Sequence, residues 1–77
     1  MSKYKPIQDF LRDKHGPLEV SFSSLADLVD GGLPDSAYRY EAWWATDATH
    51  VQSRAWVAAG YRAQPDLSKR TVRFVPN

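Results

Sequence analysis

The chain has 77 residues, two histidines, no cysteine and a formal net charge of +1 at neutral pH. This length predicts one domain over residues 1–77, near the smallest size that folds alone. The missing cysteines exclude disulfides and a thiolate zinc site, and they suit a cytoplasmic protein. The ten aromatic residues must therefore supply much of the buried area, unless the chain is also stabilised as a homodimer.

Charge is distributed unevenly along the chain. Residues 1–38 hold four bases and six acids, a net of −2, whereas residues 39–77 hold six bases and three acids, a net of +3. A basic C-terminal half is typical of a surface that faces a polyanion. No apolar run approaches the roughly 18 residues of a membrane span, and the N-terminus lacks the apolar stretch of a signal peptide. We therefore expect no membrane partner.

The first part of the chain predicts a helix, a strand and a second helix. Pro6 suits the first turn of a helix, and apolar residues recur behind it at helical spacing. Residues 18–22 alternate apolar and polar, which is the pattern of a half-buried strand. Ser23 or Ser24 is a candidate N-cap for a short helix that ends at Gly31-Gly32.

Residues 33–60 hold all three tryptophans and predict two further helices. Pro34 and Asp35 suit the start of a helix over residues 34–44. Its predicted inner face comprises Leu33, Ala37, Tyr40 and Trp44. We expect Trp44 in the core, because a small cysteine-free domain needs that volume.

The next predicted helix covers residues 50–59, with Asp47 or Thr49 as its cap and Gly60 after its end. Helical spacing places one set of side chains inward, namely Val51, Ala55, Ala58 and Ala59. The outward set comprises His50, Ser53, Arg54 and Val57, while Gln52 and Trp56 lie together on a flank.

The C-terminal part predicts a β-hairpin, with strands over residues 61–65 and 71–75 around a turn at 66–69. Pro65 is compatible with this only near an edge or a strand end. Apart from one extra helix, this is the element order of a winged-helix domain, in which the first strand pairs with the C-terminal hairpin. The predicted fold class is therefore α+β, winged-helix-like, with a three-stranded sheet.

Two overlapping helix-turn-helix units are predicted, one pairing residues 24–29 with 34–44 and one pairing 34–44 with 50–59. In either unit the second helix would enter the major groove of DNA. The helix over residues 50–59 has the better chemistry at its start, where it carries His50, Gln52, Ser53 and Arg54. Arginine and glutamine make bidentate contacts with guanine and adenine. The alternatives are a solvated helix face, or an internal role in which Gln52 and His50 brace the tryptophan-rich turn.

The hairpin carries four basic residues, Arg62, Lys69, Arg70 and Arg73, of which Lys69 and Arg70 fall at its tip. A basic hairpin is suited to contacts with a phosphate backbone. The alternative is the usual placement of lysine and arginine to protect an exposed sheet edge.

The tryptophans support two further hypotheses. Exposed rings stack on the bases of single-stranded nucleic acid. Exposed rings also form the centres of protein interfaces, and the predicted patch of that kind comprises Tyr38, Trp43, Trp56 and Val57. Burial of these rings in the core is the competing interpretation.

No catalytic or metal-binding pattern is present. His15 and His50 have no second histidine or cysteine at ligand spacing, and a zinc site needs three or four protein ligands. His50 and Asp47 lack a suitably placed nucleophile. We therefore expect neither an enzyme nor a cofactor or metal.

The chain contains five spaced motifs, Leu33-Pro34-x-Ser36-Ala37, Ala42-Trp43-Trp44, His50-x-Gln52, Ala55-Trp56 and Ala59-Gly60-Tyr61. Together they resemble a family of small uncharacterised bacterial and phage domains with an LPxSA, AWW, HxQ, AW and AGW signature. Tyr61 replaces the usual tryptophan, and Thr46-Asp47 stands where members often carry asparagine. The resemblance covers nearly the whole chain and implies a recognition module rather than a catalyst.

Together these patterns predict a DNA-binding module, a small phage or bacterial regulator that contacts duplex DNA through residues 50–59 and the basic hairpin. Tight operator binding would need a homodimer. The alternative is a protein-interaction module, such as an accessory or defence-related protein, that binds its partner through the aromatic patch.

Overall fold

The computed structural model describes residues 2–47 and 49–77. The elements are the helices α1 (Lys5–Arg12), α2 (Phe22–Leu28), α3 (Asp35–Arg39) and α4 (Ser53–Ala58), the 3-10 helix η1 (Glu41–Trp44), and the strands β1 (Leu18–Ser21), β2 (Tyr61–Asp66) and β3 (Thr71–Pro76). Part of the predicted turn at 45–49, namely Ala48, lies outside the described residues. The predicted α+β class is confirmed.

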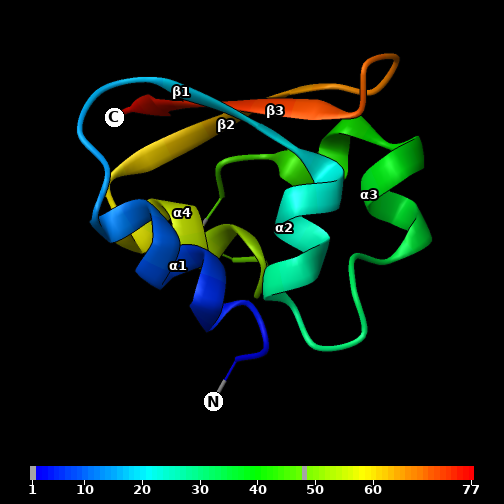
Figure 1. The fold of residues 1–77 in the computed structure, drawn as a ribbon, viewed down its shortest axis with the longest axis horizontal. Helices are drawn as coiled ribbons and strands as arrows, with labels where there is room; N and C mark the ends of the chain where they lie inside the picture. The colour runs from blue at the N-terminus through cyan, green and yellow to red at the C-terminus, as the bar shows by residue number, and fades with distance from the viewer. Residues whose placement is uncertain (1, 48) are drawn as a thin grey trace.

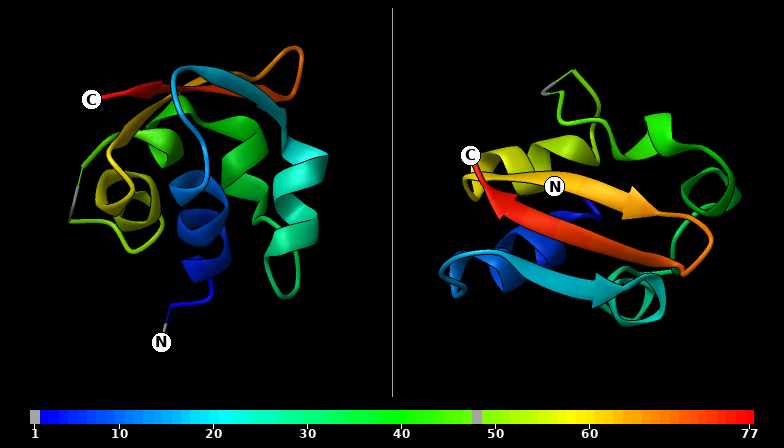
Figure 2. Two further views of the ribbon diagram at one scale, coloured as in Figure 1. Left: turned by 60° about the vertical axis from the view of Figure 1, so that its left-hand side comes forward. Right: turned by 90° about the horizontal axis from the view of Figure 1, so that it is seen from above.

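The strands form an antiparallel sheet in the order β1-β3-β2, with all the helices on one side of it (Figures 1 and 2). The last strand of the chain is thus the central one. Leu18 pairs with Phe74 across β1 and β3, and Ala63 pairs with Phe74 across β2 and β3. This register confirms the prediction that the first strand joins the C-terminal hairpin.

Side chains along β3 alternate between the two faces of the sheet. Val72 and Phe74 are buried on the face toward the helices, whereas Arg73 is exposed on the opposite face. Since successive side chains of a strand point to opposite faces, the register assigns Gln64 and Glu19, the partners of Arg73, to that exposed face as well. We call it the open face, because no helix covers it (Figure 2).

Aromatic rings fill the space between the sheet and the helices. Trp44 stacks on Phe22 at a centroid distance of 4.8 Å and on Trp56 at 5.7 Å. Trp56 in turn lies 6.0 Å from Phe74 of the sheet. All four rings are fully buried. The prediction of Trp44 as a core residue is confirmed, and Trp56 joins it there.

The predicted continuous helix over residues 34–44 is wrong. The chain leaves α3 at Tyr40, whose backbone is extended at φ −128° and ψ 124°, and continues in η1. Tyr40 is consequently 60% exposed instead of lying on the inner face. The break allows Trp44 to fold back over α3, where its Nε1–H donates a 2.8 Å hydrogen bond to the Ala37 carbonyl. Tertiary packing of one indole thus overrides the local helical pattern.

The predicted helix over residues 50–59 is shorter than expected, and its faces differ from the prediction. Ser53 is fully buried, because its hydroxyl donates hydrogen bonds to the carbonyls of Asp47 and His50. Val51, predicted to point inward, is 51% exposed before α4 begins. The serine hydroxyl competes for backbone acceptors, which a pattern of apolar spacing does not register.

The strand-to-helix junction at residues 21–22 also differs from the prediction. Phe22 belongs to α2 rather than to the strand, and Ser21 is the N-cap, with its Oγ accepting from the Ser24 amide at 3.0 Å. Ser23 and Ser24 are therefore helical. The chain passes from strand to helix without a loop, which buries Phe22 directly beneath the sheet.

Candidate nucleic-acid interface

The turn of the basic hairpin is organised by Asp66. Its Oδ1 accepts hydrogen bonds from the Ser68 hydroxyl at 2.7 Å and from the Lys69 amide at 3.1 Å. These hydrogen bonds hold the pKa of the Asp66 carboxyl below its usual value, and the bond from Ser68 has the larger effect. The local aspartate turn thereby fixes the backbone that presents Lys69, which is exposed at the tip.

Arg70 is anchored to the helical layer at both its backbone and its side chain. Its carbonyl accepts a 2.8 Å hydrogen bond from the Phe22 amide, and its guanidinium lies 5.6 Å from the centroid of the Tyr38 ring. The backbone is left-handed, with φ +55°, a value that favours glycine and that the turn imposes here on an arginine. Arg70 remains exposed at the hairpin turn, so its charge is presented from a defined position.

The remaining basic residues of the hairpin lie on the open face. Arg62 and Arg73 are both exposed, and they occupy neighbouring rows because Arg62 pairs with Val75 and Arg73 pairs with Gln64. Glu19 of β1 lies on the other side of Arg73. Among the described residues, neither open-face arginine forms an ion pair with a carboxylate; the ion pair at 3.0 Å joins Lys5 and Asp9 on α1.

The α4 region keeps only part of its predicted outward chemistry. His50 and Arg54 are exposed, as predicted. Ser53 is buried, so the prediction that its side chain faces outward is wrong. Gln52 is half-buried and its Nε2 donates a 3.1 Å hydrogen bond to the Trp43 carbonyl, which confirms the alternative in which it braces the tryptophan-rich turn.

The turn before α4 is ordered by a second aspartate. Asp47 Oδ1 accepts a 2.9 Å hydrogen bond from the Thr49 amide, and the hydrogen bonds from Thr49 lower the pKa of the Asp47 carboxyl. Asp47 is exposed, as is His50, whose positive form would add a smaller effect in the same direction.

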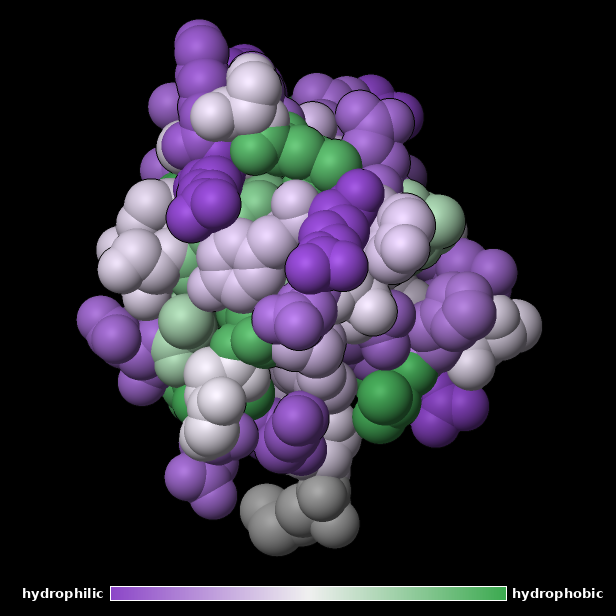
Figure 3. All heavy atoms as spheres, turned by 90° about the vertical axis from the view of Figure 1, so that its right-hand side faces the viewer, coloured by the Kyte–Doolittle hydropathy of each residue, from purple (hydrophilic) through white to green (hydrophobic). Residues whose placement is uncertain are grey.

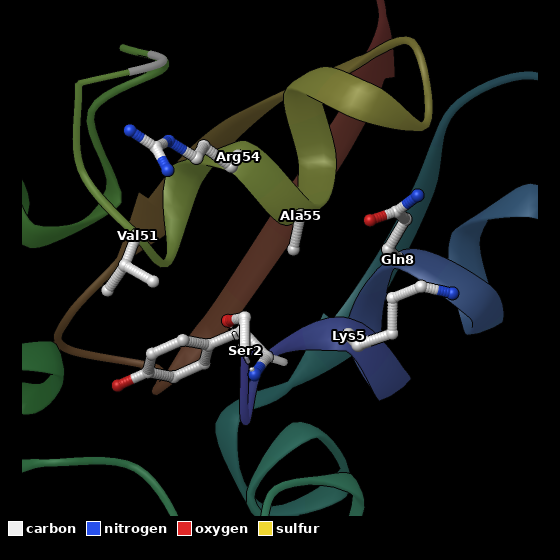
Figure 4. A pocket seen from close by; sticks show the side chains of 7 residues that line it. Ser2, Lys5, Gln8, Val51, Arg54 and Ala55 are labelled. Atoms are coloured by element: carbon white, nitrogen blue, oxygen red, sulfur yellow. Dashed lines mark hydrogen bonds between the residues drawn. The ribbon is translucent and has the colours of Figure 1, made fainter.

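A pocket of about 80 Å³ lies between the start of α1 and α4 (Figure 4), lined by Ser2, Tyr4, Lys5, Gln8, Val51, Arg54 and Ala55. Its two basic side chains point away from the hollow, as Figure 4 shows for Arg54 and Lys5. Lys5 is also paired with Asp9. The two basic side chains therefore do not converge on the hollow.

The predicted aromatic patch is wrong at its centre, because Trp56 is fully buried and Trp43 and Val57 are half-buried. Stacking on single-stranded bases is excluded for Trp44 and Trp56 for the same reason. On the face seen in Figure 3, apolar side chains surface only in small areas separated by hydrophilic ones. Such scattered exposure is ordinary for a protein surface.

The structure separates the predicted nucleic-acid residues into two clusters. The hairpin turn lies beside α3, as the contact between Arg70 and Tyr38 shows, whereas α4 lies against α1 (Figure 1). Arg62 and Arg73 lie on the open face, on the side of the sheet away from α4, which carries Arg54, and from the turn before it, which carries His50.

Sequence reasoning missed two contributors. Gln64 shares the open face with the arginines, because its register places it opposite Arg73. Thr46 accepts a 3.0 Å hydrogen bond from the Ala63 amide and so covers part of the β2 edge. Alternation along the predicted strand was sufficient to find Gln64, but no local signal pointed to Thr46.

Over the described ranges, no group of three or more histidine, cysteine, aspartate or glutamate side chains is arranged to hold a metal ion. No described helix is long and apolar enough to cross a membrane.

A helical layer behind a three-stranded antiparallel sheet, with the other sheet face open, defines the chain as a small α+β domain. Residues 4–75 match the model of the family described as Domain of unknown function (DUF7662), and the chain belongs to that family. The resemblance to a family of unknown function is thus confirmed. No curated protein and no solved structure matches the chain.

Proposed function

We propose that this domain binds duplex DNA and that the basic β2–β3 hairpin makes the main contact. The observation that carries the proposal is the exposure of all four hairpin bases, Arg62, Lys69, Arg70 and Arg73. They extend from the open face to the turn, and none is joined to a carboxylate by a described ion pair. Arginine and lysine arranged in this way suit the phosphate backbone of a duplex.

The topology supports a winged-helix-like version of this proposal. As in that architecture, the first strand pairs with a C-terminal hairpin, the sheet order is β1-β3-β2, and a helix immediately precedes the hairpin. In this version the domain is a small bacterial or phage regulator in the cytoplasm, and it needs a homodimer for tight operator binding.

Fluorescence anisotropy with a random-sequence 20-base-pair duplex tests the proposal at low and moderate salt. We expect weak binding. The logarithm of the association constant should fall linearly with the logarithm of the salt concentration, with a slope of about −0.9 for each neutralised phosphate. Replacing Lys69 and Arg70 together by alanine should flatten that slope.

The matched control is the double replacement of Arg12 and Lys14 by alanine. It removes the same charge from exposed positions at the end of α1, away from the hairpin. If both double variants lose the same DNA affinity, the effect comes from the change in net charge and not from the hairpin. Absence of binding by the native chain at low salt would overturn the proposal.

A protein partner is the second candidate, and the observation in its favour is Tyr40, a large aromatic side chain that is 60% exposed. Tyrosine is enriched at interface hot spots. If the native chain fails to bind DNA, a pull-down from a bacterial lysate should compare it with Tyr40→Ser. A captured protein that the variant loses would support this candidate.

A further inference from the structure

The open face combines two kinds of side chain that read bases. Arg73 of the central strand lies directly opposite Gln64 of β2, and Arg62 lies in the neighbouring row. All three are exposed, and side chains stand roughly perpendicular to a sheet. Arginine contacts guanine and glutamine contacts adenine, each through two hydrogen bonds in the major groove. The open face therefore carries, side by side, an arginine suited to guanine and a glutamine suited to adenine.

The two strands that carry these side chains suit the width of the groove. Arg62 and Gln64 lie on β2 and Arg73 lies on β3, which are neighbouring strands about 4.8 Å apart. The major groove of B-DNA is about 12 Å wide and admits a two-stranded β-ribbon. Because all the helices lie behind the sheet, none of them obstructs an approach along the open face (Figure 2).

The α4 helix, by contrast, is poorly equipped to read bases. It has six residues, and Ser53, Ala55 and Trp56 among them are buried. At about 1.5 Å per residue it is only about 9 Å long. Gln52, the amide side chain at its start, already donates to the Trp43 carbonyl. Because these side chains are buried or hydrogen-bonded within the domain, α4 presents few groups that could contact bases.

Building on the proposed function, we propose that the open face of the sheet, centred on Arg73, Gln64 and Arg62, enters the major groove of duplex DNA. In this arrangement the hairpin turn, with Lys69 and Arg70, extends beyond the sheet toward a phosphate strand. The start of α4, with His50 and Arg54, stays outside the groove.

Two sets of exposed single substitutions test this surface, with the same random-sequence duplex as the probe. The open-face set comprises Arg62→Ala, Gln64→Ala and Arg73→Ala, and the α4 set comprises His50→Ala and Arg54→Ala. We expect the two open-face arginine variants to weaken binding by about fivefold or more and the α4 variants to change it by less than about twofold. Circular dichroism verifies that each variant is folded.

Arg73→Lys separates geometry from charge. Lysine keeps the positive charge but lacks the planar fork that makes two parallel hydrogen bonds. Binding that remains weakened in this variant supports a contact at Arg73 through two parallel hydrogen bonds, as the proposal requires, whereas full recovery would overturn that part of the proposal.

Competition with groove ligands tests the side of the duplex that the domain contacts. Methyl green, which occupies the major groove, should displace the protein, and netropsin, which occupies the minor groove, should not. Displacement by netropsin alone would overturn the proposal.

The outcomes distinguish the two proposals. If the α4 variants lose binding and the open-face variants keep it, or if both sets lose it equally, the open face is not the groove-binding surface although DNA binding stands. If the native chain binds no duplex at low salt, DNA binding itself fails and the open-face proposal fails with it.

Discussion

The two faces of the sheet differ sharply, although the six residues of β3 contribute alternately to both. One face carries Val72 and Phe74 into a packed aromatic core, and the other presents Arg73 to solvent. The inner face has little freedom, because every ring on it contacts another ring. On the outer face, the side chains of Arg62, Gln64 and Arg73 have no hydrogen bond or ion pair with another described residue. Alternate residues of one strand therefore serve different purposes: those on the inner face stabilise the fold, and those on the outer face are available for binding.

The largest effect should come from the centre of the inner face. Trp44→Ala removes a fully buried indole and its hydrogen bond to the Ala37 carbonyl. Such truncations lower the free energy of unfolding by about 3–5 kcal/mol, which is comparable to the whole stability that a core of this size provides. We expect a largely unfolded chain by circular dichroism. A cooperative urea transition near that of the native chain would contradict the assignment of Trp44 to the core.

A second experiment compares two tryptophans that are equally buried but differently bonded. Trp44 donates to Ala37, whereas the Nε1–H of Trp56 has no hydrogen-bond partner among the described residues. Trp44→Phe leaves the Ala37 carbonyl unpaired, while Trp56→Phe removes an unpaired buried donor. The unfolding free energy should therefore fall further in Trp44→Phe, by about 1–3 kcal/mol. Urea denaturation measures the difference, and equal losses would mean that burial alone governs both sites.

The fold was predictable where local signals and packing agree. Alternation in residues 71–75 and apolar spacing around Phe10 and Leu11 were sufficient for the strand and the first helix, and the α+β class followed. The continuous helix through Tyr40 was not predictable, because the break depends on where the Trp44 indole finds its acceptor. That hydrogen bond joins residues seven positions apart and depends on a geometry between the indole and its carbonyl acceptor that the apolar spacing of the sequence does not reveal.

The candidate site was predictable in its charges but not in its arrangement. Arg62, Lys69, Arg70 and Arg73 lie on the hairpin as the pattern indicated. Ser53 and Gln52 look like surface polar residues in the sequence, yet the structure uses both for internal hydrogen bonds. Hydrogen-bonding side chains serve either the surface or the backbone, and only the fold decides between these uses.

A smaller effect concerns the hairpin turn and pH. The lowered pKa of Asp66 means that the folded state favours its ionised form, so this contribution to stability is complete above the ordinary pKa of an aspartate carboxyl. It is lost as the pH falls below that value through the lower pKa of the folded state. Asp66→Asn should therefore lose stability relative to the native chain at pH 7, with the difference narrowing toward pH 3. Urea midpoints at both pH values measure it, and a constant difference would contradict the linkage.

The smallest effect on stability should come from the outer face, which sharpens the comparison directly. Arg62→Ala and Arg73→Ala remove exposed side chains without described ion pairs, so each should change the free energy of unfolding by no more than about 0.5 kcal/mol. Urea denaturation of each variant provides the measurement. A loss above about 1 kcal/mol in either would show that the open face also helps to hold the fold.

The position of β3 also bears on how the chain folds during synthesis. The central strand is the last one made, and its pairing with β1 joins Leu18 to Phe74 across most of the chain. Non-local pairing of this kind slows folding, because a long loop must close before any contact rewards it. Until residues 71–76 leave the ribosome, the apolar faces of the helices have no sheet to cover them. This domain should accordingly fold more slowly than a bundle of local helices of similar length.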